Sequence, residues 1–302
     1  MALQLALLGV TAPLYRPLGI SIRWSSAMTS ALVLSLLFGT WLTYVLAPSR
    51  RRKIMFAEPL LAMLLLAMLT NIVGPAQYVA VALRMPTVDA WLAAGDAALG
   101  INVPALTQWT GAHPTIARAL ILAYFSLLPQ FAAPILVFGI FRPDWTQLWE
   151  YIFHFHFCLV VTLLGVALLP AACAFTHYGF DSLIDQTRFI AHFTSLRAGT
   201  FHELRFNDIE GMISFPSFHV AGALMVTWAF RRRPRWLAAL TVLNTGLIAS
   251  TVLTGAHYGV DVVATIALFA VSILLWRTWG RRGLSSGCGG AELSHIVPAK
   301  IG

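Results

Sequence analysis

The chain has 302 residues, of which 58% are hydrophobic and 11% are charged, and its formal net charge is +8. A soluble domain carries about 25% charged residues, so this composition excludes a soluble globular protein and predicts an all-α integral membrane protein. The positive charge does not indicate a nucleic-acid partner, because the basic residues fall in short runs between apolar segments.

Seven apolar segments are candidates to cross the hydrocarbon layer of a membrane, which takes about 20 helical residues. In chain order they are residues 27–47, 54–83, 114–141, 148–175, 216–230, 236–256 and 259–276. The fifth is short, and the second is long and contains Pro75, which predicts a kink or tilt. We expect an N-terminal segment over 1–26, a polytopic membrane domain over 27–282 and a flexible tail over 283–302.

The loop between the second and third segments, residues 85–113, has apolar residues at roughly helical spacing, among them Trp91 and Leu92. This spacing predicts a helix lying in the membrane interface, with Asp89 and Asp96 elsewhere on its surface. An ordinary solvated loop fits the same residues.

Basic runs define the expected topology. Residues 50–53, residues 231–235 and the arginines after the seventh segment all fall on one side of a seven-span protein, which should be the cytoplasm. The loops on the other side lean acidic, although Arg16 and Arg23 would also lie there. We therefore expect an extracytoplasmic amino terminus and site, in a plasma membrane of the bacterial type.

Two short motifs carry the candidate chemistry. The stretch 213–219 reads ISFPSFH and ends at His219, and the stretch 255–261 reads GAHYGVD and contains His257 and Asp261. His257 and Asp261 are four residues apart, so they would share one face of the seventh helix, where a carboxylate can orient an imidazole. Pro216 would begin the fifth helix, and Ser217 and the first amides would face a bound anion.

Both motifs lie where an apolar segment begins, so they would bring two imidazoles and a carboxylate to one membrane depth. Ionisable groups inside a membrane are costly and usually functional. A nucleophile and a general acid are the minimum for substitution at phosphorus. The residues thus point to phosphate-ester chemistry on a lipid.

The two motifs, FPSFH and HYGVD, resemble the second and third signature motifs of the type 2 phosphatidic acid phosphatase superfamily. The closer likeness is to its inositol phosphorylceramide synthase and sphingomyelin synthase branch. The resemblance implies a six-helix core, here within about 114–280, and a metal-free reaction without a cofactor. It implies that His257 attacks phosphorus, that Asp261 orients His257, that His219 protonates the leaving alkoxide and that Ser217 helps to bind phosphate.

The chain also departs from the family's phosphatases. Their first motif, a Lys followed after six residues by Arg-Pro, is absent, and Thr251 follows Ser250 where they carry an Arg. The transferase branch tends to lack that Arg too, so the expected activity leans towards head-group transfer, such as inositolphosphotransfer, from a lipid phosphate or phospholipid. The cationic clamp on the phosphate is unidentified, with Arg118 and Arg205 as candidates.

Two other functions fit the same residues. His219, His257 and Asp261 could form a two-His-one-carboxylate metal site of a membrane hydrolase, or they could relay protons in a transporter. The absence of an internal repeat argues mildly against common transporter designs. The three cysteines, Cys158, Cys173 and Cys288, give neither a disulfide framework nor a paired metal-ligand spacing.

Overall fold

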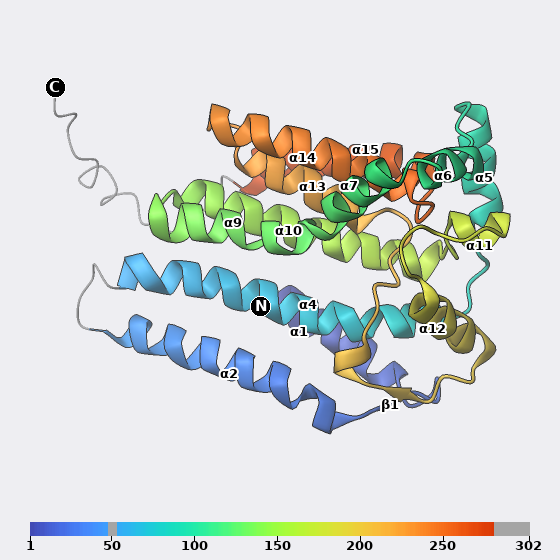
Figure 1. The fold of residues 1–302 in the computed structure, drawn as a ribbon. Coiled ribbons are helices and arrows are strands. Elements are labelled where there is room, and N and C mark those ends of the chain that lie inside the picture. Colours follow the sequence, from blue (N-terminus) through green and yellow to red (C-terminus); the bar gives the residue numbers. More distant parts are fainter. Residues whose placement is uncertain (48–52, 281–302) are drawn as a thin grey trace.

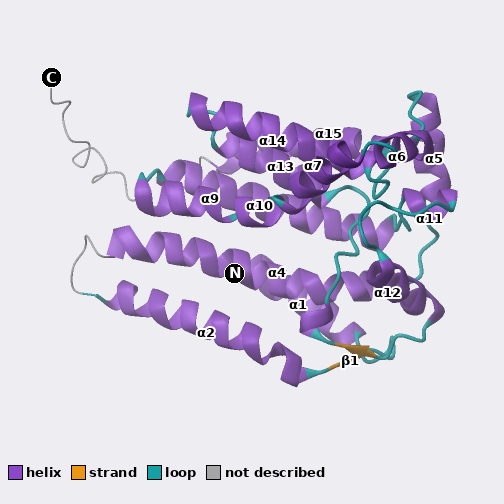
Figure 2. Ribbon diagram, in the orientation of Figure 1, coloured by secondary structure: helices purple, strands orange, loops and turns teal. Residues whose placement is uncertain are grey.

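The computed structural model describes residues 1–47 and 53–280. It is a bundle of long apolar helices that run roughly parallel, with short helices gathered at one end (Figure 1). Strands are limited in the described chain to one short parallel pair, in which Ser21 and Ile22 align with Glu203 and Leu204 (Figure 2). The expected all-α membrane class is therefore confirmed.

Among the described residues, six helical stretches are long and apolar enough to cross a membrane: Trp24–Leu46, Met55–Ala82, Pro114–Phe141, Trp145–Leu168, Pro234–Leu253 and Gly259–Thr278. The long elements are α2 (Trp24–Leu46), α4 (Glu58–Ala82) after η2 (Lys53–Ala57), α10 (Trp145–Leu168), α14 (Pro234–Leu253) and α15 (Gly259–Leu275) followed by η5 (Trp276–Gly280). The third stretch is a succession of α7 (Pro114–Phe125), α8 (Leu127–Gln130), α9 (Ala132–Ile135) and η3 (Leu136–Phe141).

The shorter elements are α1 (Ala2–Thr11), η1 (Ala12–Leu14), β1 (Ser21–Ile22), α5 (Asp89–Ala98), α6 (Val103–Gly111), α11 (Ala174–Tyr178), α12 (Thr187–Ala198), β2 (Glu203–Leu204), η4 (Phe206–Asp208) and α13 (Phe218–Ala229). α13 corresponds to the fifth predicted segment, 216–230, and at 12 residues it is shorter than a full span. The fourth predicted segment, 148–175, ends earlier, because α10 stops at Leu168 and a separate α11 follows.

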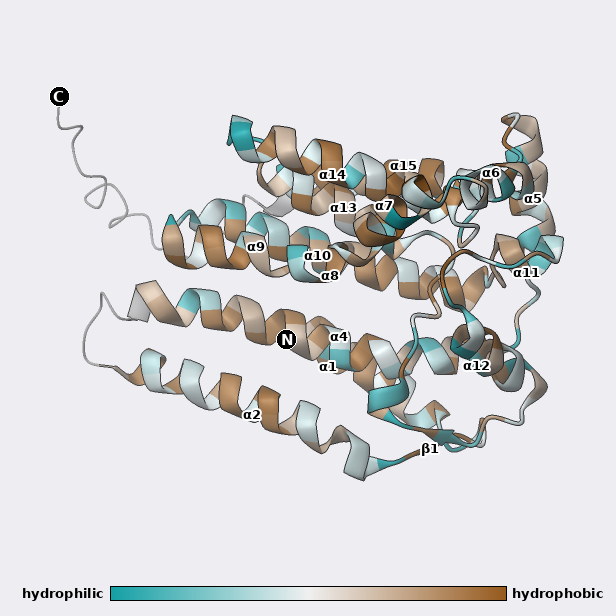
Figure 3. Cartoon of the chain, in the orientation of Figure 1, coloured by the Kyte–Doolittle hydropathy of each residue, from teal (hydrophilic) through white to brown (hydrophobic). Residues whose placement is uncertain are grey.

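The helix α10 is the centre of the bundle, since it packs against α4, α13 and α15. Large side chains such as Tyr151, Phe155 and Met225 are fully buried in this core. In contrast, α2 buries no residue although it is largely apolar, with small hydroxyl residues between its apolar ones, so its side chains are suited to face lipid (Figure 3). The arrangement leaves α4, α10, α13 and α15 to build the interior of the protein.

One end of the bundle is basic. Arg142, Arg232, Arg233 and Arg235 line a common hollow there, between η3 and the start of α14. Nearby, the buried carboxylate of Glu150 accepts hydrogen bonds from the Arg231 guanidinium at 2.8 Å and from the Trp228 indole at 3.0 Å. The predicted basic run 50–52 and the predicted tail 283–302 lie outside the described residues.

Residues 85–113 form two helices, α5 and α6, at the opposite end of the bundle (Figure 1). The prediction that Asp89 and Asp96 lie on a free surface is wrong: Asp89 is 5% exposed and Asp96 is 0% exposed. Their burial is possible because backbone and hydroxyl groups from other elements donate hydrogen bonds to both carboxylates. Trp91, on the other side of α5, is exposed.

Candidate active site

The first motif ends at the start of α13. The helix begins at Phe218, and Ser217 is its N-cap, whose hydroxyl accepts from the Val220 amide at 3.4 Å. The prediction that Pro216 opens the helix is wrong, because a serine two residues before His219 supplies the capping oxygen and the proline lies outside the helix. The Ser217 amide itself donates to the Thr265 hydroxyl of α15 at 3.0 Å.

A close approach of α10 fixes the loop before α13. A Cβ placed on Gly165 would lie 2.5 Å from the carbonyl oxygen of Phe215 and 2.6 Å from Cδ of Pro216. Only a glycine allows this backbone contact without a shift of the loop. Gly165 therefore helps to define where Ser217 and His219 lie.

The second motif is a turn at the start of α15. His257 precedes the helix, Tyr258 is the N-cap and Asp261 is the third helical residue. The Asp261 carboxylate turns back and accepts from the Tyr258 amide at 3.1 Å and from His257 Nδ1 at 3.2 Å. The two side chains meet as expected, although not across a shared helix face, because the helix begins after His257 and Asp261 turns back from its first turn.

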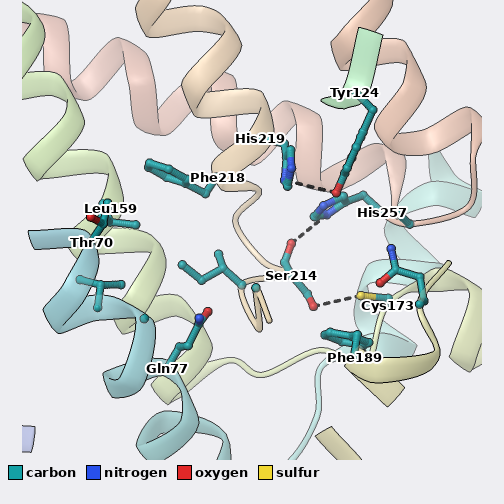
Figure 4. A pocket seen from close by; sticks show the side chains of 16 residues that line it. Thr70, Gln77, Tyr124, Leu159, Cys173, Phe189, Ser214, Phe218, His219 and His257 are labelled. Carbon is teal, nitrogen blue, oxygen red and sulfur yellow. Dashed lines mark hydrogen bonds between the residues drawn. The ribbon is translucent and has the colours of Figure 1, made fainter. Parts of the chain in front are cut away.

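The ring of His257 has its two nitrogens in different surroundings. Nδ1 lies 3.0 Å from the Ser214 carbonyl oxygen and near the Asp261 carboxylate, so it can act only as a donor to these acceptors (Figure 4). Nε2 then carries the lone pair, and it lies 3.4 Å from the Ser217 hydroxyl. This tautomer leaves an unprotonated, nucleophilic nitrogen beside the start of α13.

The two histidines lie close together. The ring centroids of His219 and His257 are 6.4 Å apart. His219 stacks on Tyr124 of α7 with a centroid separation of 4.2 Å, and the Tyr124 hydroxyl is 3.4 Å from His219 Nδ1. Figure 4 shows both imidazoles beside one another on one side of the cavity. The sequence reasoning did not single out Tyr124, because it lies on a distant segment with no motif around it.

Both imidazoles line a cavity of about 230 Å³. Its walls are mixed, with polar groups such as Ser214 and Gln77 on one part and apolar side chains such as Val73, Leu159 and Phe218 on another. Such a cavity can hold a polar head group against the histidines and an apolar group beyond them.

Cys173 also faces the cavity, and its Sγ lies 3.1 Å from the Ser214 hydroxyl. Burial raises the pKa of the thiol to about 12, so the thiol is protonated at neutral pH and can donate to Ser214. It is thus suited to support the Ser214 segment, whose carbonyl contacts His257.

The second motif is held from outside by α5. Asp96 accepts from the Gly259 amide at 3.0 Å and from the Val260 amide at 2.7 Å, and Asp89 accepts from the Tyr258 hydroxyl at 2.9 Å. Burial raises the pKa of the Asp96 carboxyl, while the bonds from the two amides lower it. Sequence reasoning missed both roles; acidic residues on an otherwise apolar segment were the available signal.

The cationic residues do not reach the cavity in the described chain. Arg118 is exposed and donates to the Pro114 carbonyl, and Arg205 pairs with Glu203 at 2.7 Å. Thr251 stands at the position of the family's Arg. Its hydroxyl donates to the Ile248 carbonyl of the same helix, and its backbone carbonyl accepts from the His257 amide at 2.9 Å. Within residues 1–47 and 53–280, neither Lys nor Arg lines the cavity.

These features define an integral membrane protein with a recessed site of two histidines and a carboxylate. Residues 90–275, more than half of the chain, match the family model described as the PAP2 superfamily. The chain belongs to this superfamily of phosphatases and phosphotransferases, which implies substrates of the phosphorylated-lipid type. No curated protein and no solved structure gives a significant match.

Proposed function

We propose that the protein is a lipid head-group phosphotransferase or lipid phosphatase that works through a phosphohistidine on His257. The observation that carries this proposal is the environment of the His257 ring. Nδ1 donates to the Ser214 carbonyl and to Asp261, so Nε2 keeps its lone pair, and it faces the Ser217 hydroxyl. An imidazole oriented in this way by a carboxylate is an activated nucleophile.

In the first half of the reaction, Nε2 of His257 attacks phosphorus, and the bond from phosphorus to the leaving oxygen breaks. His219 gives its proton to the leaving alkoxide, and Asp261 stabilises the charge that develops on the His257 ring. The Ser217 hydroxyl, 3.4 Å from Nε2, can donate to an oxygen of the phosphoryl group. The products are a free alcohol and His257 that carries the phosphoryl group, and with a phosphodiester donor the head group stays esterified to that phosphorus.

In the second half, an alcohol or water loses its proton to the now neutral His219 and attacks the phosphorus. The phosphorus–nitrogen bond breaks, so His257 returns to its neutral state and His219 is protonated again. Water as the attacking group gives a phosphatase, and a lipid or polyol hydroxyl gives a transferase.

The walls of the cavity favour transfer from a phosphodiester. A phosphate monoester carries up to two negative charges near neutral pH, whereas a phosphodiester carries one. Because neither Lys nor Arg lines the cavity in the described chain, the compensating charge in this proposal is a proton that His219 takes up together with the bound phosphate. A buried dianion would be left partly uncompensated, which is expensive. This balance supports the lean towards a phospholipid donor, while head-group transfer of the inositolphosphotransferase type stays a prediction from the sequence motifs.

We further propose that the site faces the extracytoplasmic side of a bacterial-type plasma membrane. Four described arginines, Arg142, Arg232, Arg233 and Arg235, gather at one end of the bundle. α13 begins at the site and ends at this basic end, from which α14 returns. Because basic loops stay in the cytoplasm, the histidines belong to the opposite half of the membrane.

The metal-dependent alternative has less support. The Asp261 oxygen that approaches His257 also accepts from the Tyr258 amide, so it acts as an orienting group. In the part of the chain that the structure describes, no group of three or more His, Cys, Asp and Glu side chains could hold a metal ion. The transporter alternative has less support too, because a proton relay does not require a carboxylate, here Asp261, that orients the imidazole of His257.

The test is turnover by the purified protein with EDTA present, on a panel of lipid phosphates and phospholipids, for the wild type and for His257→Ala. We expect metal-independent turnover that His257→Ala abolishes, with the ratio of transfer to phosphate release giving the activity. Turnover that EDTA removes would support the metal-dependent hydrolase, and uptake without any phosphate-ester cleavage would support the transporter.

A further inference from the structure

The start of α15 is closed to external anions, because carboxylates of the chain occupy it. Asp96 of α5 is fully buried and receives the Gly259 amide on one oxygen at 3.0 Å and the Val260 amide on the other at 2.7 Å. Asp261 receives the Tyr258 amide at 3.1 Å. The amides that a helix leaves free at its first turn are therefore already paired here.

A second carboxylate of α5 holds two neighbouring loop segments of the site. Both oxygens of Asp89 lie within hydrogen-bonding distance of the Ala172 amide, at 2.9 and 3.0 Å. One of them also accepts from the Tyr258 hydroxyl at 2.9 Å. Asp89 thereby connects the segment of Cys173, which faces the cavity, to the residue that follows His257.

The fit between α5 and the α15 turn is tight. A Cβ on Gly259 would lie 2.5 Å from Cδ1 of Ile101, and a Cβ on Gly95 would lie 3.3 Å from Cγ2 of Val260. The turn therefore has little freedom to move towards α5 without a rearrangement of both elements.

We propose that Asp96 and Asp89 are positioning residues for the reaction, acting on His257 through the backbone and side chain of the Tyr258 turn. This inference rests on the proposed function of His257. The backbone of His257 is tied on one side to the Thr251 carbonyl at 2.9 Å and continues on the other into the turn that α5 holds. If the turn shifts, Nε2 moves relative to Ser217 and to the phosphorus, and a displacement of about 1 Å can reduce a rate roughly 100-fold.

A positioning role for Asp96 and Asp89 can be told apart from a purely structural role by its effect on kcat and KM. A residue that orients the nucleophile changes the rate of phosphoryl transfer and leaves the binding of the ground state nearly unchanged. A residue that only holds the fold together lowers the yield of folded protein and leaves the kcat of the remaining folded fraction unchanged.

The test uses the full-length protein in detergent micelles with the phospholipid donor that the wild type turns over. Asp96→Asn removes the negative charge and one acceptor oxygen. Tyr258→Phe removes only the hydroxyl that donates a hydrogen bond to the Asp89 carboxylate. We expect kcat per folded molecule to fall about 10- to 100-fold for Asp96→Asn and by less for Tyr258→Phe, with KM within about twofold. Asp181→Asn, the same substitution at an exposed aspartate, is the matched control and should leave both constants unchanged.

A third variant, Asp96→Ala, leaves a space where formate can take the two amides, so formate should restore part of its kcat. Wild-type kcat in both Asp96→Asn and Tyr258→Phe would overturn the inference, as would a loss of kcat for Asp96→Ala that formate does not change. If Asp96→Asn does not fold, the result for Tyr258→Phe decides. Full activity of His257→Ala would instead refute the proposed function on which this inference rests.

Discussion

The substitution Asp261→Asn separates the orienting role of the carboxylate from its role as a helix cap. In the wild type, one Asp261 oxygen contacts both His257 Nδ1 at 3.2 Å and the Tyr258 amide at 3.1 Å. An asparagine can still cap the helix with its amide oxygen, so the fold of the turn should survive. What is lost is the negative charge that stabilises the His257 ring during attack.

The size of the effect follows from the second acceptor on Nδ1. In a serine-protease triad, the corresponding change lowers kcat about 10⁴-fold, because the histidine adopts the wrong tautomer. Here the Ser214 carbonyl lies 3.0 Å from Nδ1 and can keep the tautomer without the carboxylate. We therefore expect a smaller loss of about 10²- to 10³-fold in kcat, equal to about 3–4 kcal/mol of transition-state stabilisation.

The assay is single-turnover formation of phosphorylated enzyme, measured by rapid quench with excess enzyme over labelled phospholipid. Asp261→Asn should slow this step by the stated factor, and His257→Ala should abolish it. A rate for Asp261→Asn equal to that of the wild type would refute the orienting role. A loss as complete as that of His257→Ala, in a folded protein, would refute the argument that Ser214 preserves the tautomer.

Three further predictions concern the loop before α13, the pair of His219 and His257, and the ion pair of Glu150 with Arg231. Gly165→Ala should displace the loop before α13 and lower kcat at least about tenfold, whereas Gly39→Ala, which meets no atom within 4 Å, should be neutral in the same assay. The activity should be bell-shaped in pH, because protonation disables His257 as a nucleophile at low pH and deprotonation disables His219 as an acid at high pH; a flat profile from pH 5 to 9 would contradict this cooperation. Glu150→Ala should lower the free energy of unfolding by about 1–3 kcal/mol in detergent, with KM unchanged, because it removes the carboxylate that accepts from the partly buried Arg231 and from the Trp228 indole; a normal melting temperature would argue against a stabilising pair.

The sequence predicted the helical spans well, because a membrane span has a simple compositional signature. Its errors lie at the helix ends. Pro216 has the residue type that favours the first helical position, yet Ser217 caps the helix, because its hydroxyl reaches the Val220 amide. Similarly, α10 ends at Leu168, where the chain leaves the helix before a residue, Cys173, with a positive φ of 75°.

The contact between His257 and Asp261 was predicted from their spacing, but the surroundings of this pair were not. Asp89 and Asp96 are more than 150 residues away from the turn they hold, and no local pattern links them to it. Their burial depends on the way α5 packs on α15, which is a tertiary contact. The same holds for Tyr124, whose stacking on His219 depends on the path of α7.

The central claim is that His257 carries the phosphoryl group during turnover. The most direct test is to quench the wild type in alkali during steady-state turnover of a phospholipid, to digest it and to locate the phosphorylated residue by mass spectrometry. We predict an acid-labile adduct on Nε2 of His257 that consists of the phosphoryl group with the head group still esterified to it, and that is absent from His257→Ala, whose turnover is also lost. Steady turnover in a protein that never carries phosphate on His257, or that keeps its activity as His257→Ala, would contradict the account.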